Sequence, residues 1–172
     1  MANISESVIN FAIYENAVEY YGMAEVALPE ISNLTEEIKG AGISGSYESV
    51  ILGHIEAMTL TLNFRTFVKD AVALLEPRNH QLDLRVAQQS KDTVSGKIIV
   101  TPVKHVMVVK PKKLNPGKVA PASPAEASGE YSVTYWATFI DGEKVLEVDI
   151  LNFVYFVNGV DYLADVRKAL GK

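Results

Sequence analysis

Three histidines are the residues of this sequence best suited to bind a metal ion. His54, His80 and His105 stand far apart, and none has another histidine two or four residues away. Close spacing of this kind is what usually brings two ligands onto one metal. We therefore expect no metal site, and we interpret the three side chains as surface or interface histidines.

Two other patterns imitate catalytic or nucleotide-binding motifs. Glu36 and Glu37 are adjacent carboxylates, but neighbouring strand residues point to opposite faces, so they do not form an acid/base pair. The glycines of Gly40–Gly45 spell GxGxxG, yet no βαβ unit surrounds them, which favours a flexible loop over a phosphate site. The sequence thus predicts no catalytic, cofactor-binding or metal-binding residue, and no cofactor.

Composition excludes several classes of protein. The 172 residues are 48% hydrophobic and 22% charged, which is typical of one folded domain spanning 1–172. The net charge of −5 argues against a surface built to grip nucleic acid, although DNA could pass without sticking. The chain has no cysteine, and it shows neither a signal peptide nor an apolar run long enough to cross a bilayer. We expect a protein made in the cytoplasm, without stable membrane association.

The clearest structural pattern is an alternating strand over residues 58–65. Successive strand side chains point to opposite faces, so one set of residues should enter the core and the other should form a wet face. The predicted core set is Met58, Leu60, Leu62 and Phe64. The wet set is Thr59, Thr61, Asn63 and Arg65, and Asp83 and Arg85 occupy equivalent positions in a second alternating run, 82–89.

Further strands are indicated by β-branched and aromatic runs between turn residues. Asp141-Gly142 joins two such runs and is the strongest hairpin signal in the chain. Asn33–Lys39 could be helical or extended, and the glycines after it favour an extended strand. The other predicted strands are Val8–Tyr14, Val18–Tyr21 (after a turn at Glu15-Asn16), Ala24–Leu28, Ser46–Leu52 (ending at a break, Gly53-His54), Lys97–Val109, Tyr131–Ile140 and Glu143–Phe156.

Helices and loops are fewer. Phe67–Glu76 has apolar residues at helical spacing before Pro77, and Asp161–Leu170 predicts a closing helix with Asp161 as its N-cap. The Pro-, Ala- and Lys-rich stretch at about 111–129 predicts a long exposed loop. Many strands with few helices imply a mainly β fold, an antiparallel β-sandwich or partial barrel with one flanking helix.

The stretch from Ala24 to Phe64 resembles the major tail tube proteins of contractile-tailed bacteriophages, which also occur in phage-tail-like contractile bacteriocins. The matching features are Leu28-Pro29, the charged run Thr35-Glu36-Glu37, the Gly-Ala-Gly loop at Gly40–Gly42 and the strand Ala57–Phe64. Length, the mid-chain helix and the closing hairpins extend the resemblance over most of the chain. Lys110–Glu130 has no counterpart in it.

The resemblance implies a structural protein and not an enzyme. Subunits of this family form hexameric rings whose strands merge into one inner β-barrel, and the rings stack into a tube that conducts DNA or ions on contraction. By this resemblance, Thr59, Thr61, Asn63, Arg65, Asp83 and Arg85 are expected to face the lumen. A ring-stacking loop is expected within residues 40–56. Its candidate residues are Gly40, Gly42, Ser44, Tyr47, Glu48 and His54.

The same resemblance implies the partners and the location. They are further copies of the chain, the tail sheath protein, the tape-measure protein and baseplate tube-initiation proteins, with DNA as non-specific cargo. The expected location is a virion tail or tail-like particle assembled in the bacterial host cytoplasm. Two alternatives stay open: a tube protein of a bacterial contractile secretion system carrying effectors, and a small-ligand-binding or hydrolytic β-barrel.

Overall fold

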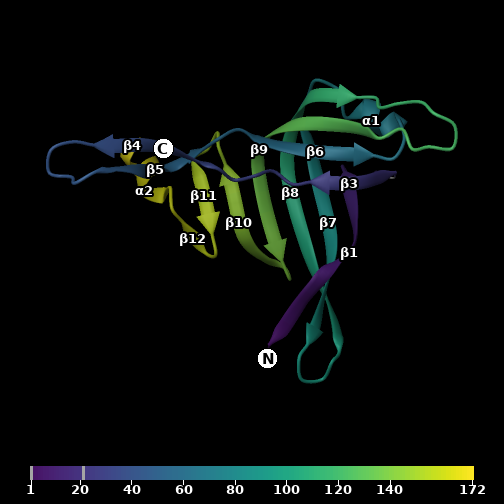
Figure 1. The fold of residues 1–172 in the computed structure, drawn as a ribbon, viewed down its shortest axis with the longest axis horizontal. Coiled ribbons are helices and arrows are strands. Elements are labelled where there is room, and N and C mark those ends of the chain that lie inside the picture. Colours follow the sequence, from purple (N-terminus) through teal and green to yellow (C-terminus); the bar gives the residue numbers. More distant parts are fainter. Residues whose placement is uncertain (1, 21) are drawn as a thin grey trace.

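A computed structural model describes residues 2–20 and 22–172 of the chain (Figure 1). The described residues form twelve strands and two short helices, so the fold is mainly β, as predicted. The elements in chain order are β1 (Asn3–Glu15), β2 (Val18–Tyr20), β3 (Met23–Ala27), β4 (Asn33–Lys39), β5 (Ser46–Ile55), β6 (Met58–Phe64), α1 (Lys69–Ala73), β7 (His80–Asp92), β8 (Ile98–Asn115), β9 (Ala127–Ile140), β10 (Glu143–Asp149), β11 (Val154–Val157), β12 (Val160–Asp161) and α2 (Ala164–Ala169).

Ten of these strands belong to one antiparallel sheet in the order β12-β11-β10-β9-β8-β7-β1-β2, with β3 and β6 branching from β9. The branch exists because β9 has two partners along one edge. Its first half, Ala127–Val133, pairs with β6, and its second half, from Tyr135 onward, pairs with β10. Figure 1 shows β3 and β6 running across β1, β7 and β8, so the sheet folds over itself into two layers with crossed strands.

The core lies between these two layers. The inner side of β6 is excluded from solvent, because its four apolar side chains are each at most 1% exposed: Met58, Leu60, Leu62 and Phe64. We call β3 and β6 the narrow layer and the strands from β10 to β1 in the sheet order the wide layer. The four side chains share one apolar cluster with side chains of the wide layer: Ile13, Leu82, Leu84, Met107, Tyr131 and Trp136. Each fully buried large aliphatic side chain stabilises the fold by about 1.5–3 kcal/mol. The alternation of β6 is therefore what holds the two layers together.

The predicted hairpin turn is confirmed at Asp141-Gly142, between β9 and β10. Both residues have positive φ, 51° and 83°, which is the signature of the type I′ turn favoured by the right-handed twist of paired strands. The first hairpin, β1–β2, turns at Asn16-Ala17, one residue later than predicted, again with both φ values positive. Tyr21, at the end of the predicted run Val18–Tyr21, lies outside the described residues.

Both helices are shorter than predicted. α1 spans Lys69–Ala73, and only Ala71 and the C-cap residue Leu74 are buried, so a longer helix would have no further core to cover. α2 spans Ala164–Ala169, and its N-cap is Leu163, not Asp161. Asp161 lies in β12, where its carboxylate accepts the Leu163 N–H and pairs with Arg167.

The stretch 33–55 is an antiparallel hairpin of its own, β4–β5, which extends away from the body of the protein (Figure 1). The extended interpretation of Asn33–Lys39 is confirmed. The predicted break at Gly53-His54 is wrong, because β5 continues to Ile55, with Gly53 adopting a φ of 73° inside the strand.

The predicted loop at 111–129 is shorter in the structure. β8 continues through Pro111 to Asn115, and β9 begins at Ala127, which leaves residues 116–126 between them. Pro111 is tolerated because the register between β8 and β9 shifts immediately after it, between Pro111 and Lys113. The apolar side chain of Leu114 packs against the core, which draws this end of β8 into the sheet.

Candidate functional site

The first set of predicted lumen residues lies on the outer side of β6. Thr59, Thr61 and Asn63 are half-buried, and Arg65 is exposed just beyond the end of the strand. Their cross-strand neighbours on β9 are polar as well, namely Ser132, Glu130 and Ser128. Nζ of Lys112 donates to the Thr59 hydroxyl at 3.3 Å, so this surface is hydrated and carries the charges of Lys112, Glu130 and Arg65.

The second set lies on the outer side of β7, in the wide layer. The Asp83 carboxylate is 3.1 Å from Nη2 of Arg85 and 3.4 Å from Nζ of Lys104. The Arg85 guanidinium also stacks on Tyr14, with 4.8 Å between Cζ and the ring centroid. Arg85 is thus held by a carboxylate and an aromatic face together.

Strand register extends this second set into two rows across the wide layer. Glu147, Ala137, Val106 and Asp83 lie opposite one another on β10, β9, β8 and β7. Lys144, Phe139, Lys104 and Arg85 form the neighbouring row. The two carboxylates of the first row pair with the three cations of the second, Asp83 with Arg85 and Lys104, and Glu147 with Lys144 at 2.6 Å. Sequence reasoning missed these rows because cross-strand pairing is not visible in a single alternating run.

The two predicted sets point away from each other. The inner sides of β6 and β7 enter the same core, where Leu60 and Leu62 share a cluster with Leu82 and Leu84. β6 pairs with β3 and β9 and not with β7, so the two strands belong to opposite layers. Their outer sides therefore face opposite surfaces. The structure brings Asp83 and Arg85 together and separates them from the β6 set.

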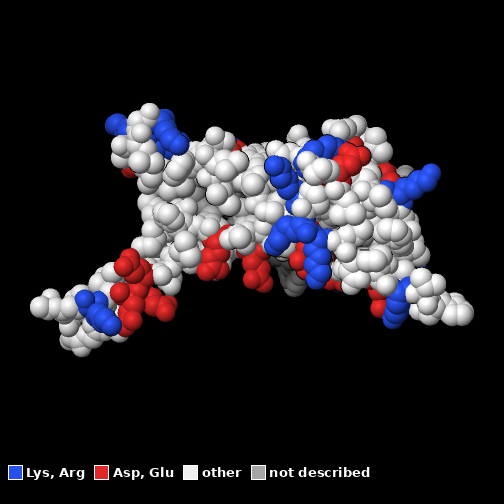
Figure 2. Space-filling view, turned by 90° about the horizontal axis from the view of Figure 1, so that it is seen from above, with Lys and Arg blue, Asp and Glu red and all other residues white. Residues whose placement is uncertain are grey.

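The residues predicted to form a ring-stacking loop are spread along the β4–β5 hairpin. Gly40, Gly42 and Ser44 form its turn, Tyr47 and Glu48 follow in β5, and His54 lies near its base. The region 40–56 is therefore mostly a strand and not a loop, which corrects the sequence interpretation. Figure 2 shows acidic side chains gathered on this arm, at the lower left of the view.

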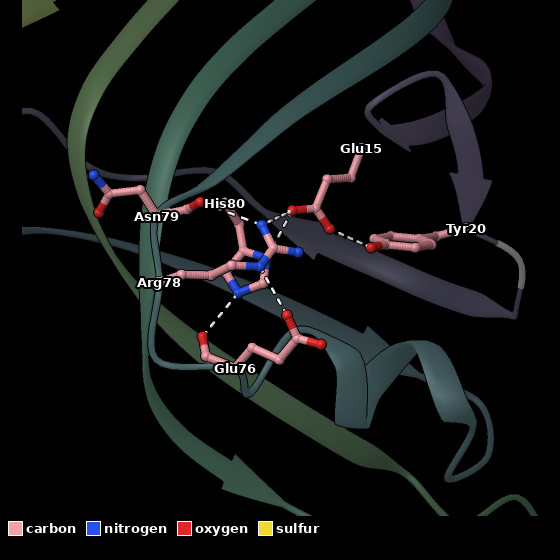
Figure 3. Close-up of polar contacts among 6 residues, drawn as sticks. All are labelled: Glu15, Tyr20, Glu76, Arg78, Asn79 and His80. Atoms are coloured by element: carbon pink, nitrogen blue, oxygen red, sulfur yellow. Dashed lines mark hydrogen bonds and ion pairs between the residues drawn. The ribbon is translucent and has the colours of Figure 1, made fainter.

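A buried polar cluster that the sequence did not reveal joins β1, β2 and β7 (Figure 3). Glu15 is its centre: the carboxylate accepts hydrogen bonds from Tyr20, from Nη1 of Arg78 at 2.9 Å and from Nδ1 of His80 at 2.7 Å. The other ring nitrogen of His80 lies 3.0 Å from the Glu76 carbonyl oxygen. Both ring nitrogens therefore lie within hydrogen-bonding distance of an oxygen.

His80 is fully buried, so its interpretation as a surface or interface histidine is wrong. Burial acts to raise the pKa of Glu15, but the hydrogen bonds from Tyr20, His80 and Arg78 outweigh it and hold this pKa below its ordinary value. Burial beside Glu15 likewise raises the pKa of Tyr20. The cluster is a compensated set of charges that ties the end of β1 to the start of β7.

His105 is also buried, which corrects the same expectation, whereas His54 is exposed. Nδ1 of His105 accepts a hydrogen bond from the Trp136 indole N–H at 3.3 Å and lies 2.8 Å from the Thr138 hydroxyl oxygen. Burial lowers the pKa of His105, which favours the neutral ring that this donor requires. Its role is to satisfy polar groups in the core.

Within the described residues, no group of three or more His, Cys, Asp or Glu side chains is arranged to hold a metal ion. In the same part of the chain, no helix is long and apolar enough to cross a membrane. An open cleft of about 970 Å³ lies over β1, β7 and β8, with mostly apolar lining.

Comparison with known proteins places the fold among tube proteins. The chain is 25% identical to the tail tube protein of Escherichia phage P2 over 162 residues, which cover 92% of this chain and 93% of the relative. A chain of an extracellular contractile injection system, the PVC sheath/tube terminator in the extended state, has a TM-score of 0.52 and 11% identity, covering 76% of this chain and 94% of that one. That likeness concerns the fold.

A chain of the PVC sheath-tube complex in the extended state has a TM-score of 0.48 and 13% identity, covering 75% of this chain and 87% of that one. The family model described as phage tail tube protein FII matches residues 5–171, which is nearly the whole chain. This protein therefore belongs to the phage tail tube protein FII family.

Proposed function

We propose that this chain is a structural subunit of the inner tube of a contractile phage tail or tail-like particle. In this proposal, six copies form a ring, and stacked rings enclose a lumen that conducts DNA or ions. The support is the family membership over residues 5–171 together with the broad outer face of the wide layer, on which acidic and basic side chains are paired. Joining sheets from several copies into one barrel would also remove open strand edges.

The lumen wall in this proposal is the outer face of β10, β9, β8 and β7, with Asp83 and Arg85 at its centre. Five neighbouring strands, β10 to β1, give this layer the width that a barrel wall requires. Its charges are paired within the layer, so a polyanion would meet little net attraction and could slide past. Thr59, Thr61, Asn63 and Arg65 then face outward, because one subunit cannot turn two opposite surfaces to one axis.

This assignment can be tested on assembled tubes with single-cysteine variants of the cysteine-free chain. Gln81→Cys places a thiol on the outer face of β7, and Thr61→Cys places one on the outer face of β6. Biotin-maleimide followed by streptavidin should label Thr61→Cys tubes and leave Gln81→Cys tubes bare, because streptavidin is too bulky for a narrow lumen. The reverse pattern would assign the lumen to β6, one of the two strands that were expected from the sequence to face it.

The proposed partners are further copies of the chain, a sheath protein, a tape-measure protein and baseplate tube-initiation proteins. DNA would be non-specific cargo, and the location would be a tail particle assembled in the host cytoplasm. A sheath protein is included because the chain shares its fold with a protein described as a sheath/tube terminator. Microscopy of the purified protein, looking for rings or hollow tubes, tests the proposal as a whole.

A second candidate function is the tube of a contractile injection machine whose lumen carries effector proteins. The shared fold with an extracellular contractile injection system favours it. The two functions predict different surroundings for the same tube: a DNA-filled head, or a headless particle with protein in the lumen. Purifying native particles and staining them for a head separates the two.

A further inference from the structure

β1 presents a long open edge. On one side it pairs with β7 from Asn3 to Glu15, but on the other side only Ile13, Tyr14 and Glu15 pair, with the short strand β2. Within the described chain, residues 3–12 therefore carry an unpaired row of backbone groups. Such an edge is a template for a further strand.

The opposite edge of the same sheet is formed by short strands. It ends in β12, which has two residues, preceded by β11 with four. Neither is long enough to pair with ten residues of β1. The partner edge must therefore come from elsewhere in another copy of the chain.

The β4–β5 hairpin supplies an edge of matching length. β5 has ten residues, and within residues 2–20 and 22–172 β4 and β5 pair only with each other, so each keeps one free edge. The hairpin lies at one end of the long axis, away from the free part of β1 (Figure 1). A contact between the two would join one copy to the next head to tail, which closes into rings or extends into a tube.

Both segments expose apolar side chains that the chain leaves uncovered. On β1, Ile4, Val8 and Ile9 are 51–58% exposed. On β5, Tyr47, Val50 and Leu52 are 55–59% exposed. The open cleft of about 970 Å³ begins beside β1 at Asn10, Phe11 and Ala12, so side chains of an added strand would have room.

The hairpin carries a cluster of carboxylates, and two lysines lie beside the free part of β1, Lys91 on β7 and Lys97 in the turn before β8, while β1 itself carries Glu6 there. Glu37 and Glu48 lie directly across the β4–β5 ladder from each other, with Glu36 beside them. Like charges in this position destabilise a hairpin. Among the described residues, none of these three carboxylates forms an ion pair within 4 Å. In the same part of the chain, neither Lys91 nor Lys97, which lie next to the free part of β1, forms an ion pair within 4 Å.

We propose that the β4–β5 hairpin of one subunit adds to the free edge of β1 in a neighbouring subunit, with Glu37 and Glu48 facing Lys91 and Lys97. This inference rests on the proposed function as a tube subunit and names the strands that join its copies. Backbone pairing provides the contact, and the charges select the partner.

Disulfide trapping tests the contact. Ser7→Cys on β1 is combined with Ser49→Cys on β5, and Ser5→Cys with Ser49→Cys provides a second register. Because these strands do not pair within one chain, oxidation of tubes should give a ladder of cross-linked multimers on non-reducing gels from at least one pair. The matched control, Ser7→Cys with Ser132→Cys on β9, should give at least tenfold less ladder.

Charge reversal gives an independent readout. Glu37→Lys with Glu48→Lys should raise the protein concentration needed for tube formation about tenfold, which corresponds to 1.4 kcal/mol. Adding Lys91→Glu and Lys97→Glu to the same chain should restore assembly. If wild-type tubes form but neither cysteine pair cross-links in tubes, or if the lysine-to-glutamate changes do not restore assembly of the charge-reversed variant, this inference is overturned and the proposed function still stands. A wild-type protein that forms neither rings nor tubes overturns both.

Discussion

Gly53 of β5 lies directly against Leu163, the residue that begins α2. A Cβ built on Gly53 would fall 2.3 Å from Cδ2 of Leu163, closer than carbon atoms approach in proteins. Gly53 also has a φ of 73°, which side chains other than glycine rarely adopt. This contact fixes the base of the β4–β5 hairpin against the C-terminal part of the sheet.

Gly53→Ala should therefore destabilise the protein, by about 1–3 kcal/mol for the backbone strain alone. Displacement of Leu163 should add to that cost, and the hairpin should become susceptible to limited proteolysis. Gly42→Ala is the matched control, because Gly42 has a φ of 90° but nothing within 4 Å of its Cβ position. If urea unfolding shows the same loss of unfolding free energy in the two variants, the contact with Leu163 contributes nothing to stability.

The Glu15 cluster predicts a specific dependence of stability on pH. Because the pKa of Glu15 is lower in the folded state, its contribution is present above the unfolded value of about 4.3 and is lost as pH falls through the folded value. Glu15→Gln leaves Arg78 and His80 without their carboxylate and should cost about 3–5 kcal/mol near pH 7. The difference in the free energy of unfolding between Glu15→Gln and wild type should become smaller below about pH 4.

Urea titrations at several pH values measure this difference. Glu143→Gln, at an exposed carboxylate of β10, is the control and should change stability little at any pH. If the loss of unfolding free energy caused by Glu15→Gln stays constant between pH 7 and pH 3, the role assigned to the buried carboxylate is contradicted.

The two sides of β6 should tolerate charge very differently. Leu60→Asp with Leu62→Asp places two carboxylates in the core and should abolish folding, because each loses about 1.5–3 kcal/mol of apolar burial and adds the cost of a buried charge. Thr61→Lys, on the opposite side, should fold with stability changed by at most about 1 kcal/mol, the span of strand propensities. Circular dichroism and gel filtration check both; an insoluble Thr61→Lys variant would contradict the assignment of the faces.

The alternation of β6 and the Asp141-Gly142 turn were predictable because they depend on neighbouring residues and on the period of a strand. The separation of Thr61 from Asp83 was not, because it depends on β9 changing its partner from β6 to β10 halfway along its length. The Glu15–His80 contact joins residues 65 positions apart, so no local spacing announces it. Long-range pairing decided what the sequence alone left open.

The connection between β8 and β9 should be dispensable only in its middle. The Ala125 N–H donates to the Arg65 carbonyl and the Lys118 N–H donates to the Ala125 carbonyl, which fixes the base of this loop. Replacing 119–124 by Gly-Ser should leave folding and tube formation unchanged. Deleting 112–127 removes strand residues from both β8 and β9 and should prevent folding. Loss of tubes by the shorter replacement would show that the tip of the loop takes part in assembly.

Electron microscopy of the purified wild-type protein in negative stain tests most directly whether this chain is a tube subunit. We expect stacked rings or hollow tubes of uniform diameter, with six-fold symmetry in end-on averages. A protein that remains strictly monomeric at high concentration, with neither rings nor tubes on the grid, would contradict it.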